Sequence, residues 1–121
     1  MKRILLPLFL ATLAASAPAT AQEKSDSELR AGIEKRPWYS LRHEYRFLDS
    51  GVILVDGQPT YQTWRIKDGL LYRTWQFQGE SKAQTEATQI IEVNDIQLAE
   101  REISGKYKGV VEVMYSQPPR R

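Results

Sequence analysis

The sequence predicts a mostly β protein, an antiparallel up-and-down meander rolled into a small barrel of about seven strands, with one short N-terminal helix. Three observations carry this prediction. Apolar and polar residues alternate from residue 38 onward, which is typical of half-buried strands. Turn sequences recur at intervals of about 8–12 residues, and Asp68-Gly69 is the strongest hairpin signal among them. The chain has no cysteine for a disulfide, and closing the sheet into a barrel removes its exposed edges.

Residues 1–21 have the order of a secretory signal peptide. Lys2 and Arg3 form a basic start, an apolar run of 12 residues follows at positions 4–15, and residues 19–21 (ATA) match the small-x-small pattern before a signal-peptidase cut. A membrane-spanning helix needs about 20 apolar residues, which disfavours an uncut anchor. We therefore expect cleavage after Ala21, a periplasmic or secreted protein, and no membrane span after signal removal.

Charge and composition exclude several classes of protein. The chain has 17 basic and 15 acidic residues, and two of the basic ones lie in the predicted signal, so the remaining chain has no net charge. A neutral chain with scattered charges predicts no nucleic-acid partner. The absence of cysteine and the presence of one histidine predict no thiol chemistry, no metal site and no cofactor such as haem.

Residues 22–37 are expected to form a polar leader and a short helix. Ser25 and Glu28 have the spacing of a capping box, in which each side chain bonds the backbone N–H of the other. Leu29 and Ile33 lie four apart on one face, and Pro37 stops the helix. The predicted helix spans residues 26–35. A barrel domain at residues 38–116 and a tail at residues 117–121 complete the expected organisation.

The predicted strands follow in order. In the first, at residues 38–47, five residues alternate with polar ones: Tyr39, Leu41, His43, Tyr45 and Phe47. Strands at 52–55, 60–67 and 70–77 follow, with turns at 49–51, 56–59 and 68–69. After a loop at 78–85, the last three strands are predicted at 86–93, 96–103 and 106–115, with turns at 94–95 and 104–105. Residues 95–103 also contain good helix formers, so a helix there remains an alternative.

Three segments resemble small bacterial lipocalin-like domains. Residues 45–52 (YRFLDSGV) are similar to the F-x-x-x-G-x entry of that group. Residues 64–71 (WRIKDGLL) resemble its central hairpin, and residues 90–98 (IIEVNDIQL) resemble the hairpin that follows. The resemblance spans about residues 39–115. It implies a barrel that binds something inside it or on its surface, and it implies no catalytic residue.

Aromatic crowding supplies the predicted ligand-binding residues, which are Tyr39, His43, Tyr45, Trp64, Tyr72 and Trp75. His43 could be a ligand or proton-transfer group in a cavity, although a core histidine held by one hydrogen bond is the more common arrangement. The aromatic side chains could stack on a sugar or an apolar ligand, or simply pack in the core. Arg65 and Arg73 are expected to make surface ion pairs, with Glu92 or Glu112 as partners.

No catalytic motif is present: the chain has no Gly-x-Ser-x-Gly elbow, phosphate loop, dinucleotide glycine pattern or calcium loop. We therefore expect an exported, non-catalytic binding or accessory domain for a small apolar, glycan or other envelope-derived ligand. One alternative is a protein-interaction module, such as an inhibitor of an envelope enzyme or a subunit of an envelope complex. Another is a small hydrolase or isomerase that uses His43 with a nearby carboxylate.

Overall fold

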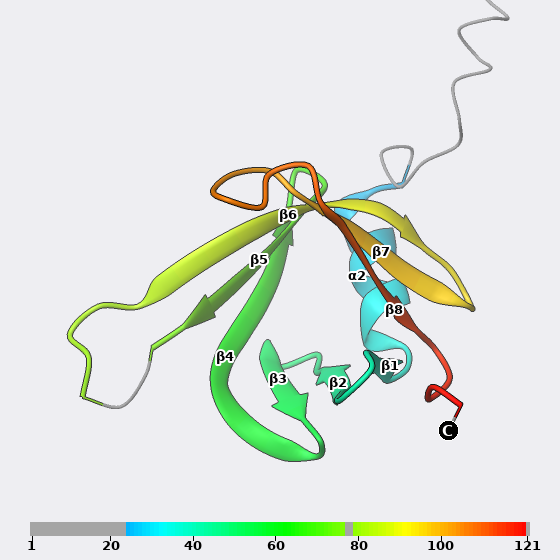
Figure 1. Ribbon diagram of the computed structural model, residues 1–121, viewed down its shortest axis with the longest axis horizontal. Coiled ribbons are helices and arrows are strands. Elements are labelled where there is room, and N and C mark those ends of the chain that lie inside the picture. The colour runs from blue at the N-terminus through cyan, green and yellow to red at the C-terminus, as the bar shows by residue number, and fades with distance from the viewer. Residues whose placement is uncertain (1–23, 77–78, 121) are drawn as a thin grey trace, which may run out of the picture.

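A computed structural model describes residues 24–76 and 79–120. Within these residues one helix precedes eight strands: α2 (Asp26–Glu34), β1 (Trp38–Tyr39), β2 (Glu44–Phe47), β3 (Val52–Val55), β4 (Gln58–Lys67), β5 (Leu70–Trp75), β6 (Gln84–Val93), β7 (Gln97–Glu102) and β8 (Val111–Tyr115). Each strand pairs antiparallel with the next, and β8 returns to β1, so the sheet is a closed barrel (Figure 1). The predicted β-barrel with one short helix is confirmed.

The predicted signal peptide at residues 1–21 lies outside the described residues. Within the described ranges, no helix has the length and apolar character needed to cross a membrane.

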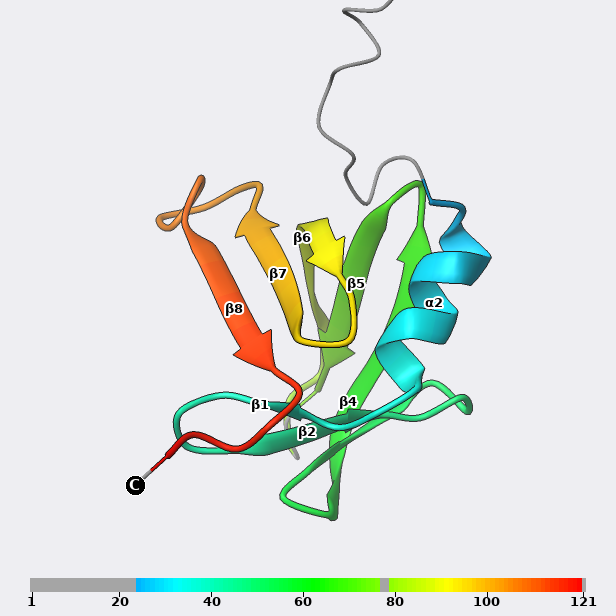
Figure 2. The ribbon, with the colours of Figure 1, turned by 90° about the vertical axis from the view of Figure 1, so that its right-hand side faces the viewer.

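Helix α2 begins and packs as its sequence predicts. Ser25 Oγ accepts the N–H of Glu28 at 3.1 Å, and Glu28 Oε1 accepts the N–H of Ser25 at 2.9 Å, which completes the capping box. The apolar pair Leu29 and Ile33 is fully buried against the barrel. Figure 2 shows α2 packed against the barrel next to β4, and the helix also contacts β2 and β6.

The N-terminus of α2 is fastened to the β4–β5 turn. The carboxylate of Asp26 accepts the backbone N–H groups of Asp68 at 2.8 Å and Gly69 at 2.9 Å. Asp68 and Gly69 have φ values of 54° and 79°, as a two-residue type I′ turn requires. The predicted Asp68-Gly69 hairpin is therefore confirmed, and its free amides also hold the helix.

The prediction of one strand at residues 38–47 is wrong, because a tight turn divides the segment into β1 and β2. The N–H of Ser40 donates to the carbonyl of His43 at 2.9 Å, and Ser40 Oγ accepts the N–H groups of Arg42 and His43. Serine hydroxyls favour such turns because they bond nearby backbone groups. Leu41 is consequently 88% exposed, and His43 is exposed instead of lying on the core face.

Strand β7 is one residue shorter at each end than the predicted strand at 96–103, and β8 begins five residues later than predicted. Residues 97–102 form strand β7, so the alternative of a helix at 95–103 is wrong. Strand β8 begins at Val111 instead of residue 106, because the connection closes in a bulge. The N–H of Gly109 donates to the carbonyl of Glu102 at 2.8 Å, and the N–H of Glu102 donates to Val110 at 2.9 Å. Gly109 has a φ of 90°, which identifies a G1 bulge.

The hydrophobic core fills the end of the barrel that α2 covers. Its members are Leu29, Ile33, Trp38, Phe47, Ile53, Trp64, Leu71, Ile90, Val93 and Leu98. Both buried indoles donate to a backbone carbonyl, Trp38 to Ile33 at 2.9 Å and Trp64 to Leu48 at 2.8 Å. Side chains therefore fill this end of the barrel interior, and both indole N–H groups within it have a hydrogen-bond acceptor.

Candidate functional site

The opposite end of the barrel interior is polar. Side chains directly opposite each other in an antiparallel sheet share a face. Arg73 lies opposite the core residue Trp64, and Glu100 lies opposite the core residue Ile90, so both point inward. Glu112 lies opposite Glu100 and points inward as well.

These strands enclose a cavity of about 740 Å³, which we call the open-end cavity. It is lined by the turn at residues 40–43 and by Tyr45, Gln62, Arg73, Glu86, Glu100, Glu102, Tyr107, Glu112, Val113 and Met114. A cavity of this size is within the range of small-molecule sites.

An ion pair between the partly buried Arg73 and the buried Glu100 lies at the inner boundary of this cavity. Arg73 Nη1 and Nη2 donate to the two carboxylate oxygens of Glu100 at 2.8 and 3.0 Å, and Thr88 Oγ1 donates to Glu100 Oε1 at 2.5 Å. Burial alone would raise the pKa of Glu100, but Arg73 and the hydrogen bonds outweigh it and hold that pKa below the usual value. Glu100 is therefore a fixed anion. The guanidinium of Arg73 also lies 5.5 Å from the ring of Phe47, so the pair abuts the core.

Three further carboxylates share the cavity wall, those of Glu86, Glu102 and Glu112. Burial raises the pKa of Glu102, and the neighbouring charges of Glu86 and Glu112 raise it further. Within the part of the chain that the structure describes, none of the three forms a salt bridge. Since Glu100 neutralises Arg73, these carboxylates give the cavity a negative potential, with Arg42 as the remaining cation in its lining.

His43 lies at the edge of the cavity and is oriented by an acid. Its Nδ1 lies 2.7 Å from Asp56 Oδ2, and Asp56 Oδ1 accepts the N–H of Glu44 at 2.9 Å. The hydrogen bond from Glu44, followed by that from His43, lowers the pKa of Asp56. The ring of Tyr45 stands edge-on to the imidazole, with centroids 6.2 Å apart. This pair fixes the orientation of the only histidine in the chain.

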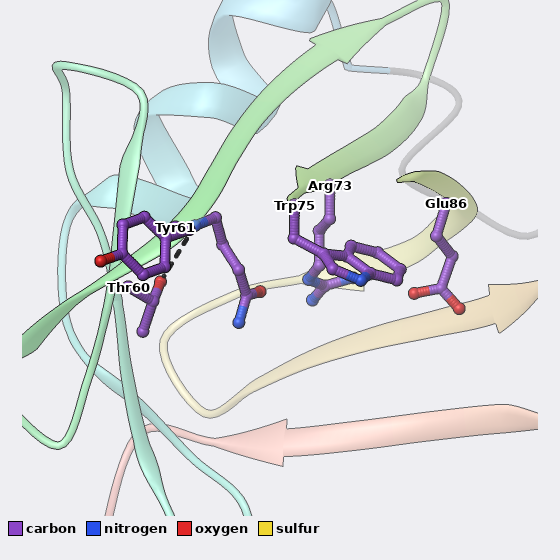
Figure 3. A pocket seen from close by; sticks show the side chains of 6 residues that line it. Thr60, Tyr61, Arg73, Trp75 and Glu86 are labelled. Carbon is purple, nitrogen blue, oxygen red and sulfur yellow. Dashed lines mark hydrogen bonds between the residues drawn. The ribbon is translucent and has the colours of Figure 1, made fainter. Parts of the chain in front are cut away.

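A second hollow, of about 540 Å³, adjoins the open-end cavity and is lined by Thr60, Tyr61, Gln62, Arg73, Trp75 and Glu86. Figure 3 shows the indole ring of Trp75 next to the side chain of Arg73. Gln62, Arg73 and Glu86 line both hollows, so Trp75 borders the same charged interior. The fluorescence of Trp75 can therefore report on this part of the interior.

The structure places the six predicted ligand-binding residues in three different environments. His43 and Tyr45 line the open-end cavity, and Trp75 lines the adjoining hollow. Trp64 is a core residue, with its ring 5.3 Å from that of Phe47. Tyr72 lies under the guanidinium of Arg65 at 4.3 Å, opposite Arg65 and Ala87 in the sheet and so on the outer face.

Tyr39 is the sixth of these residues, and it lies outside the cavity. It lines an outer groove with Leu41, Val113 and Tyr115, and its hydroxyl donates to Glu44 Oε2 at 3.2 Å. Partial burial and this carboxylate raise the pKa of the Tyr39 phenol.

The cavity's charged residues are those that the sequence reasoning missed. Arg73 was expected on the surface with Glu92 or Glu112, but it points inward and pairs with Glu100. The alternation of Leu71, Arg73 and Trp75 places Arg73 on the same face as a core leucine, and this pattern indicates that Arg73 points inward. The alternation of Leu98, Glu100 and Glu102 carried the same signal for the glutamates.

Comparison of the chain with family models, curated proteins and solved structures finds no match. Among the residues that the structure describes, no three acidic, histidine or cysteine side chains converge closely enough to hold a metal ion. The arrangement offers charge, aromatic surface and space to a ligand.

Proposed function

We propose that the protein is an exported, non-catalytic binding domain that takes a small ligand into the open-end cavity. The observation that carries the proposal is the division of the barrel interior. Helix α2 and the core fill one end, and the other end keeps about 740 Å³ between strands β4–β8 and the β1–β2 turn. A rigid barrel with a packed base and a polar hollow provides a pre-formed site with little conformational cost on binding.

The lining favours a cationic ligand with a flat or apolar part over the small apolar or glycan ligand expected from the sequence. The carboxylates of Glu86, Glu102 and Glu112 attract a positive charge, and Arg73 is neutralised by Glu100. Trp75 and Tyr45 provide aromatic surface on which such a ligand can stack.

Three matched probes test this proposal: 2-phenylethylamine (cationic), 2-phenylethanol (neutral) and 3-phenylpropanoate (anionic). We expect the amine to bind most tightly, with a change in Trp fluorescence that the variant Trp75→Phe removes. Glu102→Gln should weaken amine binding about five- to tenfold, since one partly exposed charge contributes on the order of 1 kcal/mol. Affinity should also fall on acidification, because the raised pKa of Glu102 makes it lose its charge at a higher pH than an ordinary glutamate does.

The matched control is Glu92→Gln, since Glu92 is exposed, bonds Asn94 and Gln97, and is not among the residues that line the cavity. It should leave the amine's dissociation constant unchanged in calorimetry. Preferred binding of the anion, or no binding of any probe, would refute the proposal.

A further inference from the structure

The barrel is closed by a single residue pair. Strands β7 and β8 are joined by five pairs, from Gln97↔Tyr115 to Arg101↔Val111. Strand β8 meets β1 only at Tyr39↔Tyr115. Figure 2 shows β8 at the side of the barrel, with β1 and β2 crossing below it. Most of the outer edge of β8 therefore has no neighbouring strand among the described residues.

The hydrogen-bond pattern identifies the backbone groups on this edge. Glu102 bonds Val110 through the bulge, and the N–H of Ser116 donates to the carbonyl of Ile96 at 2.8 Å. Hydrogen-bonded pairs alternate along an antiparallel ladder, so Glu112 and Met114 direct their backbone groups toward β7. Val111 and Val113 direct theirs away from β7. Within the described ranges, no strand or loop pairs with these two residues.

The two sides of this edge differ in chemistry. On the outer side lie exposed apolar side chains, those of Leu41, Val111 and Tyr115, of which Tyr115 is 50% exposed. On the inner side, Glu112 borders the open-end cavity together with Glu102 and Glu86. Among the lysines and arginines that the structure describes in that lining, only Arg42 is not neutralised by Glu100, and three carboxylates outweigh it, so the inner side is acidic.

We propose that the outer edge of β8 receives an extended segment of a partner protein in which basic and apolar residues alternate. The segment runs antiparallel to β8, as β1 does, and bonds the N–H and C=O groups of Val111 and Val113. Its alternate side chains point to opposite faces, so the basic ones meet the acidic inner side and the apolar ones meet Leu41, Val111 and Tyr115. This inference does not depend on the binding of a small molecule in the cavity.

A second copy of the chain fits this edge less well. The antiparallel register that pairs Val111 with Val113 of another copy, and so satisfies both free residues, places Glu112 directly opposite itself. Like charges in directly opposed positions destabilise a strand pair. The charge of the edge therefore favours a basic partner over self-pairing.

An acetylated six-residue peptide amide of alternating lysine and valine tests the inference on the full chain. The measurement is hydrogen exchange of individual backbone amides by NMR. At a peptide concentration about ten times the dissociation constant, exchange at Val111 and Val113 should slow about tenfold. A peptide with three lysines followed by three valines, and an alternating glutamate–valine peptide, should give no such protection.

The variant Val113→Pro removes one free N–H without removing a bond to β7, a position at which edge strands tolerate proline. It should weaken peptide binding at least tenfold, and Val113→Thr, which keeps the N–H, should bind as the unaltered protein does. Peptides N-methylated at alternate residues provide a test that does not require a folded variant. Methylation on the residues that face β8 should abolish binding, and methylation on the other residues should not.

Equal binding of the alternating and block peptides, or binding without protection of Val111 and Val113, would overturn the inference. So would concentration-dependent protection of these amides in the protein alone, accompanied by a dimer in analytical ultracentrifugation, since the occupant would then be a second copy.

Discussion

At the scale of single residues, the polar half of the interior depends on Arg73 and Glu100. Glu100 is 5% exposed, and its carboxylate accepts hydrogen bonds from both Nη atoms of Arg73 and from Thr88 Oγ1. Removing one partner of a buried pair leaves the other charge uncompensated in a medium of low polarity. The two residues are therefore coupled, and each alone is harder to replace than both together.

We expect Arg73→Met to lower the free energy of unfolding at neutral pH by about 3–5 kcal/mol, measured by urea denaturation. The double variant Arg73→Met, Glu100→Leu should recover most of the loss, because no buried charge remains. A double variant as unstable as the single one would contradict this account.

The loss of unfolding free energy caused by Arg73→Met should also become smaller as the pH falls. In the protein itself, Arg73 keeps the folded pKa of Glu100 below its unfolded value, so this stabilisation is present above the unfolded pKa and is lost as pH falls through the folded one. Without Arg73, burial raises the folded pKa above the unfolded one. The unpaired carboxylate of Glu100 then destabilises the folded variant at neutral pH, and this effect disappears once the carboxylate is protonated.

At the scale of elements, α2 is held by its buried apolar face and by two polar connections at its N-terminus. Ser25 Oγ accepts the N–H of Glu28 within the helix, and the Asp26 carboxylate accepts two N–H groups of the β4–β5 turn. The second connection joins elements far apart in sequence.

We expect Asp26→Ala to lower the free energy of unfolding by about 1–2 kcal/mol, because two turn amides lose a charged acceptor. Ser25→Ala should cost about 1 kcal/mol through loss of the cap. Lys35→Ala, an exposed position beyond the helix, is the matched control and should change stability by less than about 0.5 kcal/mol. An unchanged Asp26→Ala midpoint in thermal or urea unfolding would show that the turn contact contributes nothing.

Local patterns predicted most elements. Strand β3 and the Asp68-Gly69 turn were predicted with the observed bounds, and the helix ends within one residue of its prediction, because caps, turns and alternation act over a few residues. The prediction of one strand at 38–47 failed because the Ser40 turn depends on backbone hydrogen bonds that alternation does not record. The predicted start of β8 was wrong for a similar reason, since the bulge at Gly109 extends the loop before the strand.

At the scale of the whole molecule, the barrel has one apolar end and one charged end, and the sequence did not predict that division. Arg73 and Glu100 belong to strands that are not neighbours in the sheet, so their contact depends on the curvature of the closed barrel. Aromatic content alone predicted six binding residues, yet Trp64 packs in the core while His43, Tyr45 and Trp75 border the hollows. Residue type therefore predicts a site less well than the direction in which each side chain points.

The single pair that closes the barrel has a consequence for folding kinetics. Strands β1–β8 pair in sequence order, so every backbone strand pairing except Tyr39↔Tyr115 joins strands adjacent in the chain. Contacts between neighbours in sequence form early because they close short loops, and the one distant pair forms after them.

If the β4–β5 hairpin forms in the folding nucleus, Gly69→Ala, at a φ of 79°, should slow folding in stopped-flow fluorescence. Tyr115→Ala should instead speed unfolding and leave the folding rate nearly unchanged. If Tyr115→Ala slowed folding and Gly69→Ala only sped unfolding, the Tyr39↔Tyr115 pair would already be formed in the transition state. On this account the rate-limiting structure is a curled sheet whose first and last strands have not yet met, and the sealing of the barrel is the last step to native structure.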